Sequence, residues 1–219
     1  MPEYHEIDSP ESFAQLIDVS RETLDKLTGY VELLNKWQRR INLVGPKTLS
    51  EVWQRHFLDS AQVYTYIDSS GGPLLDLGSG AGFPGLVLSI MGIPNITLLE
   101  SNQKKCSFLG EVIRQAGCDA QVFKGRIEDY PSKKLADTVT ARALAPLENL
   151  LTRSYPLLSE NGKCLFLKGE NHEQELTAAE KRWTMEVQIH PSKADNTNKW
   201  DESAAGVLLE IGKLMPRDG

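Results

Sequence analysis

The fold is decided by one stretch of the chain, Leu74-Leu75-Asp76-Leu77-Gly78-Ser79-Gly80-Ala81-Gly82-Phe83-Pro84-Gly85. Its first four residues predict a short buried strand, and Pro84 suits the first turn of a helix, where its missing N–H costs nothing. The glycines between them lack a Cβ and let a ligand approach the backbone, while the helix N-terminus supplies free N–H donors. The stretch therefore predicts a nucleotide-like ligand at the first strand of an α/β sheet.

Strands and helices alternate beyond this stretch. Further strands are predicted at 96–100, 120–123, 137–141 and 163–167, and helices at 84–91, 104–116, 146–158 and 173–182. Near-continuous apolar strands that alternate with helices indicate a parallel sheet covered on both faces. The segments 186–189 and 207–211 predict a closing antiparallel pair. The predicted class is α/β, a Rossmann-like and mostly parallel sheet with an antiparallel last strand.

The first part of the chain has a different pattern. Apolar residues from Leu24 to Val44 recur at helical spacing, and Thr48 with Glu51 has the form of a capping box at the start of a second helix. The turn-rich stretch 68–73 marks a boundary. We therefore predict an N-terminal helical subdomain at 1–70, a candidate for RNA contact, and a ligand-binding domain at 71–219.

Composition excludes several classes of protein. With 24 Lys+Arg against 30 Asp+Glu, the net charge of −6 argues against a protein that holds nucleic acid by bulk charge. The apolar stretches fall short of the roughly 20 residues of a membrane span, and no secretory signal is expected at the N-terminus. Three cysteines without CxxC spacing predict a reducing cytoplasm, and four scattered histidines predict no metal site. Nothing in the pattern demands a dimer, so a monomer is expected.

Two ligands are compatible with the glycines. Gly80, Gly82 and Gly85 match the dinucleotide pattern, with Glu100 placed 20 residues after Gly80 as a ribose-binding acid. However, Gly78 precedes that match, and Pro84 occupies the turn where N–H groups would face a pyrophosphate. Counted from Gly78, the stretch resembles the first motif of class I methyltransferases that use S-adenosylmethionine. A carboxylate suits two vicinal ribose hydroxyls because it accepts both hydrogen bonds.

The motifs together resemble one family, the ribosomal small-subunit methyltransferase G or glucose-inhibited division protein B family. The resemblance rests on residues 37–43, 55–60, 75–85, 104–109, 125–128, 141–145 and 167–169. Its most specific parts are Gly-Phe-Pro-Gly at 82–85 and Arg-Ala-Leu-Ala at 142–145. One departure is Lys105, where the family usually has an arginine.

The resemblance implies a function. Enzymes of this family transfer a methyl group from S-adenosylmethionine to N7 of a guanosine in the 530 loop of 16S rRNA. The implied partner is 16S rRNA or the small ribosomal subunit, with an assembly intermediate as a further candidate substrate. Guanine N7 carries no proton, so its methylation needs alignment at near-attack distance rather than a general base. Open alternatives are a methyltransferase for another RNA or a small molecule, and a cofactor-binding regulator without activity.

The site residues follow from the same comparison and from their places at strand ends. The resemblance implies cofactor contacts by Gly78, Gly80, Gly82, Phe83, Glu100, Ile127, Glu128 and Arg142. Arg126, Arg142 and Lys168 follow three predicted strands, so we expect them to converge at one sheet edge as the catalytic group.

Substrate contacts are expected on the helical part. Arg39 and Arg40 belong to a basic cluster expected to lie on a helix and to hold RNA backbone, with His56 near them. His56 and the nearby Asp59 also predict a polar network between the two parts of the chain.

Overall fold

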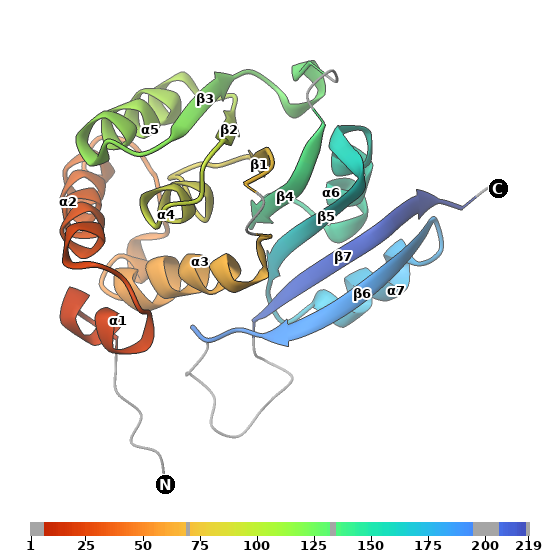
Figure 1. Ribbon diagram of the computed structural model, residues 1–219, viewed down its shortest axis with the longest axis horizontal. Helices are drawn as coiled ribbons and strands as arrows, with labels where there is room; N and C mark the ends of the chain where they lie inside the picture. The colour runs from red at the N-terminus through yellow and green to blue at the C-terminus, as the bar shows by residue number, and fades with distance from the viewer. Residues whose placement is uncertain (1–6, 69–70, 132–134, 195–205, 218–219) are drawn as a thin grey trace, which may run out of the picture.

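The computed structural model describes residues 7–68, 71–131, 135–194 and 206–217. Its strands are β1 (Leu74–Leu77), β2 (Ile96–Glu100), β3 (Ala120–Lys124), β4 (Ala136–Arg142), β5 (Leu158–Lys168), β6 (Trp183–Pro191) and β7 (Val207–Pro216). They form one sheet in the order β3-β2-β1-β4-β5-β7-β6 (Figure 1). Every strand contains the residues predicted for it.

The pairing confirms the predicted class. The strands from β3 through β2, β1 and β4 to β5 are parallel, whereas β7 runs antiparallel to both β5 and β6. The last strand is therefore antiparallel, as predicted, but it lies between β5 and β6 rather than at the sheet edge. Because the parallel strands all point the same way, their carboxyl ends meet at one edge of the sheet.

The helices cover both faces of the sheet. They are α1 (Pro10–Leu16), α2 (Arg21–Gln38), α3 (Asp59–Ala61), α4 (Gly85–Ile90), α5 (Gln103–Ala116), α6 (Leu147–Ser154) and α7 (His172–Ala179). A π-helical turn, Trp53–Leu58, precedes α3, and the 3-10 turn Tyr155–Leu157 separates α6 from β5. In Figure 1, α2, α4 and α5 lie on one side of the sheet and α6 and α7 on the other.

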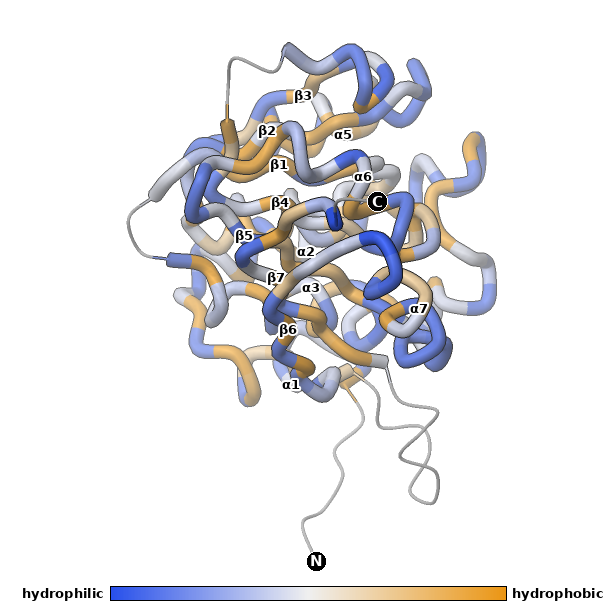
Figure 2. Tube along the Cα trace, turned by 90° about the vertical axis from the view of Figure 1, so that its right-hand side faces the viewer, coloured by the Kyte–Doolittle hydropathy of each residue, from blue (hydrophilic) through white to orange (hydrophobic). Residues whose placement is uncertain are grey.

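Two hydrophobic clusters correspond to the two faces. Successive side chains of β1 alternate between them, since Leu74 belongs to the first cluster and Leu75 and Leu77 to the second. The apolar central strands are visible in Figure 2. The first cluster also contains buried residues of the N-terminal helices, such as Leu27 and Phe57. The N-terminal helices therefore share a core with one face of the sheet, and the division at residue 70 stays a prediction.

Helix α2 is shorter than its apolar stripe predicts. It ends at Gln38, whose side chain accepts hydrogen bonds from the N–H groups of Leu43 (2.9 Å) and Val44 (3.1 Å). The Gln38 amide also donates to the Val44 carbonyl at 2.8 Å. This side chain stabilises a turn in place of a further helical turn, so Arg39 and Arg40 follow the helix instead of lying on one of its faces.

Candidate functional site

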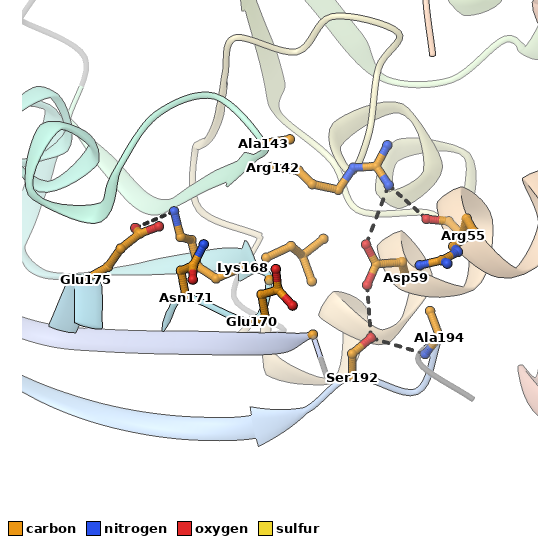
Figure 3. A pocket seen from close by; sticks show the side chains of 13 residues that line it. Arg55, Asp59, Arg142, Ala143, Lys168, Glu170, Asn171, Glu175, Ser192 and Ala194 are labelled. Carbon is orange, nitrogen blue, oxygen red and sulfur yellow. Dashed lines mark hydrogen bonds and ion pairs between the residues drawn. The ribbon is translucent and has the colours of Figure 1, made fainter. Parts of the chain in front are cut away.

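Two cavities open at the carboxyl edge of the parallel strands. The first, named the Glu100 cavity, has a volume of about 340 Å³ and is lined by Gly78, Leu99, Glu100, Ser101, Lys105, Gly125, Arg126, Ile127, Glu128, Ala143, Leu144 and Arg153. The second, named the Arg142 cavity, has a volume of about 410 Å³ (Figure 3). Its lining residues are Arg55, Asp59, Arg142, Ala143, Leu167, Lys168, Gly169, Glu170, Asn171, Glu175, Ser192, Ala194 and Gly206. Ala143 lines both, so the two cavities share a wall.

The glycine loop wraps around the Glu100 carboxylate. Gly78 and Gly80 have left-handed backbones, with φ of 62° and 58°. This conformation lets the Gly80 N–H donate to Glu100 at 2.9 Å, while the Asn102 N–H donates to the other oxygen at 2.7 Å. Glu100 is only 8% exposed yet lines the cavity. Its orientation is therefore set by two backbone donors, and further acceptor positions remain for a ligand.

Asp76 lies behind the glycine loop and lines neither cavity. It is fully buried and accepts a hydrogen bond from the Thr140 hydroxyl at 2.8 Å. Burial raises the pKa of this carboxyl to about 6, against the lowering effect of hydrogen bonds from Ser79 and Thr140. The Asp76 carboxyl is thus bonded to Ser79 of the loop and to Thr140 of β4.

The second half of the glycine loop is fastened to the N-terminal helices. Tyr30 donates a hydrogen bond to the Ala81 carbonyl, and its ring stacks on Phe83 with 5.4 Å between centroids. His56 also stacks on Phe83, at 5.0 Å. Gly80, Gly82 and Phe83, predicted as cofactor contacts, line neither of the two cavities. In the structure Phe83 belongs to the aromatic core that holds the loop.

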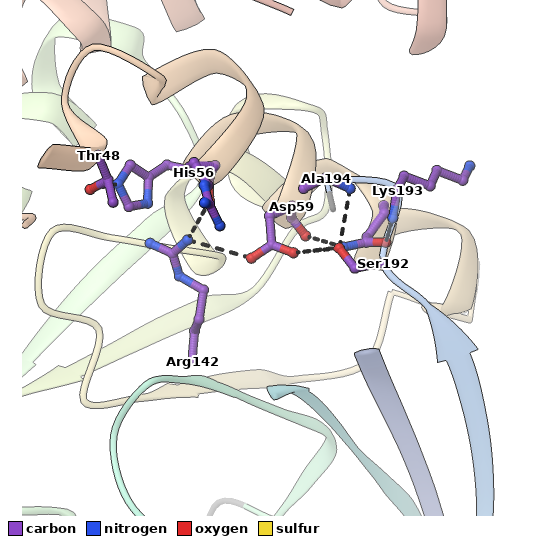
Figure 4. A network of polar contacts seen from close by, with 9 residues as sticks. Thr48, His56, Asp59, Arg142, Ser192, Lys193 and Ala194 are labelled. Atoms are coloured by element: carbon purple, nitrogen blue, oxygen red, sulfur yellow. Dashed lines mark hydrogen bonds and ion pairs between the residues drawn. The ribbon is translucent and has the colours of Figure 1, made fainter. Parts of the chain in front are cut away.

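Arg142 is the centre of a polar network (Figure 4). Its guanidinium donates to the Arg55 carbonyl at 3.0 Å, approaches Asp59 at 3.5 Å, and lies 4.9 Å from the centroid of the Phe83 ring. Burial lowers the pKa of Arg142, an effect that Asp59 opposes. The predicted polar network between the two parts of the chain is confirmed for Asp59, which faces Arg142, but not for His56, whose side chain pairs with Thr48 in the same part.

Asp59 extends this network to the end of β6. Its Oδ1 accepts hydrogen bonds from the Gln62 amide at 2.8 Å and from the Ser192 hydroxyl at 3.1 Å. Gln62 in turn accepts from the Lys193 N–H at 2.9 Å. One carboxylate therefore links the helical part, the end of β4 and the segment after β6.

The three predicted catalytic cations are divided between the cavities. Arg142 and Lys168 line the Arg142 cavity, whereas Arg126 is exposed and lines the Glu100 cavity. Lys168 is already paired, with its Nζ 2.6 Å from Glu175 and 3.1 Å from the Ala145 carbonyl. The cations do meet at one edge of the sheet, but at two separate sites.

The predicted substrate contacts lie outside both cavities. Arg39 and Arg40 are exposed beyond the end of α2, and within the described part of the chain no ion pair involves either. His56 is 8% exposed, and its Nε2 lies 2.9 Å from the Thr48 hydroxyl. The predicted capping box of Thr48 with Glu51 is wrong, because Thr48 ends a 3-10 turn, Pro46–Thr48, and its hydroxyl donates to the Gly45 carbonyl.

Comparison with known proteins decides the family. A family model described as GidB, rRNA small subunit methyltransferase G, matches residues 23–200. The chain belongs to the rRNA small subunit methyltransferase G family. It is 51% identical over 186 residues to that methyltransferase from Paramagnetospirillum magneticum, covering 85% of this chain and 90% of the relative. It is 45% identical to the one from Rhodospirillum rubrum, covering 94% and 98%.

Solved structures support the fold of this methyltransferase G family member. Pyrococcus horikoshii TYW2 in complex with MeSAdo matches with a TM-score of 0.57 and 13% identity, covering 81% of this chain and 66% of that one. The glycopeptide N-methyltransferase MtfA complexed with sinefungin matches with a TM-score of 0.56 and 12% identity, covering 71% and 92%. At these identities the likeness shows a shared fold.

Among the described residues, no helix has the length and apolarity to cross a bilayer.

Several lining residues escape sequence reasoning. Asn171, Arg153 and Ser101 carry no motif of their own, and the cavities contain them only because their elements end at this edge. Ala143 has a left-handed backbone with φ of 50°, a conformation that an alanine in the sequence does not predict. The Arg-Ala-Leu-Ala motif was the available signal, because it places a small residue directly after the β4 arginine.

The buried His56 predicts a pH-dependent stability. Burial lowers the pKa of His56 to about 3, and the charges of Arg142 and Arg55 add to the effect. Between pH 6.5 and 3 the unfolded chain binds a proton there and the native chain does not, so stability falls as pH falls. The free energy of unfolding is therefore lower by roughly 2 kcal/mol at pH 5 than at pH 7.5.

We test this with His56→Phe, whose ring can still stack on Phe83. Urea titrations at pH 7.5 and 5.0 measure the free energy of unfolding of wild type and variant. Between these pH values the wild type is expected to lose roughly 2 kcal/mol relative to the variant. A pH-independent difference contradicts the assignment.

Proposed function

We propose that this chain transfers a methyl group from S-adenosylmethionine to N7 of a guanosine in the 530 loop of 16S rRNA. Membership of the methyltransferase G family supports the reaction and the substrate class. The structural observation that carries the proposal is the pair of cavities joined at Ala143, one beside the Glu100 carboxylate and one beside Arg142. A methyl donor in one cavity and an acceptor base in the other are separated by a single small residue.

The residues of the Glu100 cavity fit the cofactor. The Glu100 carboxylate, fixed by two backbone donors, is an acceptor for two ribose hydroxyls. Gly78 has no Cβ, and Leu99, Ile127 and Leu144 supply apolar walls for the adenine ring. Glu128 is an acceptor for the adenine amino group. When bound, S-adenosylmethionine supplies an electrophilic methyl group on a positively charged sulfur.

The Arg142 cavity is proposed to receive the target base. Enzymes that act on a base take it out of the stack into a pocket, where hydrogen bonds read its edge. Arg142 offers donors that suit guanine O6, and the amide of Asn171 and the carboxylate of Glu170 lie in the same cavity. Because N7 has a free lone pair, the task of these side chains is to align the base for attack.

The remaining surface contacts are also proposals. Arg126 beside the Glu100 cavity, and Arg39 and Arg40 at the end of α2, are proposed to hold rRNA backbone. We propose that the protein is a cytoplasmic monomer and that an assembly intermediate of the small subunit is one form of its substrate. Light scattering of the purified chain measures the oligomeric state.

The reaction is tested by measuring m7G in 16S rRNA. Mass spectrometry of RNase-digested rRNA is compared between a wild-type strain, a strain lacking the gene, and the same strain carrying it on a plasmid. We expect m7G in the 530 loop to disappear in the deletion strain and return on complementation. Unchanged m7G contradicts the proposal and leaves another RNA or a small molecule as the acceptor.

A charge reversal separates RNA binding from cofactor binding. Arg39 and Arg40 are exposed and line neither cavity, so Arg39→Glu with Arg40→Glu is expected to weaken rRNA binding about tenfold at low salt. The affinity for S-adenosylhomocysteine, measured by calorimetry, is expected to stay at the wild-type value. Equal rRNA methylation by wild type and variant refutes this role.

A further inference from the structure

Lys168 and Glu175 form a partly buried ion pair in the lining of the Arg142 cavity (Figure 3). Lys168 Nζ lies 2.6 Å from Glu175 Oε2, and their side chains are 10% and 24% exposed. The same Nζ donates to the Ala145 carbonyl at 3.1 Å. The same Oε2 accepts a hydrogen bond from the Leu147 N–H at 2.6 Å. Lys168 therefore also binds the backbone of the segment between β4 and α6, and Glu175 binds the backbone of the first residue of α6.

The contact with Leu147 is a helix cap supplied from another element. Helix α6 begins at Leu147, and no side chain of the preceding residue, Pro146, caps it. The Glu175 carboxylate takes one of the free N–H groups and places a negative charge at the helix N-terminus, where it is favourable. Lys168 neutralises that carboxylate. Removing either partner leaves the other charge partly buried without its counter-charge.

The segment held by this pair forms the wall of the Glu100 cavity. Ala143, with φ of 50°, lines both cavities, and Leu144 lines the Glu100 cavity. Leu144 also packs closely against the glycine loop, since a Cβ on Gly78 would meet its Cδ1 at 2.5 Å. A shift of the segment at Ala145 or Leu147 therefore changes the shape of the cofactor side, although Lys168 itself lines only the Arg142 cavity.

We propose that Lys168 and Glu175 are positioning residues that clamp residues 143–147 and thereby shape the cofactor pocket. This inference rests on the proposed function, because it takes the Glu100 cavity as the cofactor site. It replaces the expectation that Lys168 belongs to the catalytic group. Two of the three donors of its ammonium group are already used within the protein.

The test is calorimetry with S-adenosylhomocysteine in the absence of RNA. Lys168→Met and Glu175→Leu are each expected to lower the affinity by about tenfold or more, and the double variant is expected to bind no more weakly than either single variant. Lys168→Arg keeps the charge and the donors, so it is expected to stay within about threefold of wild type. Circular dichroism melts establish that each variant is folded at the temperature of the titration.

Lys213→Met is the matched control. Lys213 forms an exposed ion pair with Glu186 at 2.7 Å. On β7 it lies beyond Ile211, toward the end of the strand opposite Val207, which pairs with Lys168. Its loss is therefore expected to leave the affinity unchanged. If Lys168→Met is folded and binds S-adenosylhomocysteine as wild type does, the clamp is refuted and a direct RNA contact is favoured. Additive losses in the double variant also refute it. If the wild-type chain itself does not bind S-adenosylhomocysteine, the proposed function fails, and the clamp fails with it.

Discussion

Arg142→Ala is expected to lower the rate constant of methyl transfer to rRNA by about 100-fold or more, the scale of losses caused by misplacing a reacting group. Arg142 lines the cavity proposed for the base and directly precedes Ala143, which both cavities share. Its guanidinium is held by the Arg55 carbonyl, by Asp59 and by the face of Phe83, so its position is fixed before any substrate binds. The substitution by alanine removes this preorganised guanidinium. The measurement is single-turnover transfer of labelled methyl to small subunits.

Folding must be separated from chemistry in this variant. Alanine leaves the half-buried Asp59 without one partner, although its bonds with Gln62 and Ser192 remain. We therefore expect a modest loss of stability, and the assay is run well below the measured Tm. Arg182→Ala removes an exposed arginine paired with Glu148 and is expected to methylate as wild type does. Wild-type turnover by Arg142→Ala would remove this residue from the catalytic group.

Gly85→Ala is expected to destabilise the protein by about 3 kcal/mol, the upper part of the usual range for overpacking a core. Gly85 is buried at the start of α4. A Cβ there would overlap Leu98 and lie 2.9 Å from Cβ of Asp76. Since Leu98 and Asp76 are fully buried, neither can move aside freely. Urea denaturation followed by circular dichroism measures the change.

Gly110→Ala is the matched control for this substitution. Gly110 lies inside α5, and a Cβ there meets nothing within 4 Å. Alanine at such a position in a helix is expected to stabilise the protein by about 0.5–1 kcal/mol. Opposite signs for the two variants are the expected result. Equal effects would show that packing against Leu98 and Asp76 does not explain the glycine at position 85.

The strands of the sheet were predicted well because each strand is marked by residues that are adjacent in the sequence. The apolar runs located all seven strands, and the glycines located the loop at the end of β1. Helix ends were predicted less well. The apolar stripe continues to Val44, but α2 ends at Gln38 because the Gln38 side chain binds backbone groups five and six residues later. Such competition between side chain and helix leaves no trace in periodicity.

The sequence by itself determined the α/β class, the glycine loop, the acid at the end of β2 and the edge where the site lies. The class and the edge follow from apolar runs that alternate with helices and from the rule that parallel strands end at one edge. The loop and the acid follow from the glycine motif and from the 20-residue spacing between Gly80 and Glu100. The tertiary structure alone decided the partners of the charges at that edge. Arg142 meets Asp59, 83 residues earlier, and Lys168 is occupied by Glu175 and the Ala145 carbonyl. Whether a cation at a strand end is free for substrate depends on what the other elements bring beside it, and that is settled only when the sheet and helices pack.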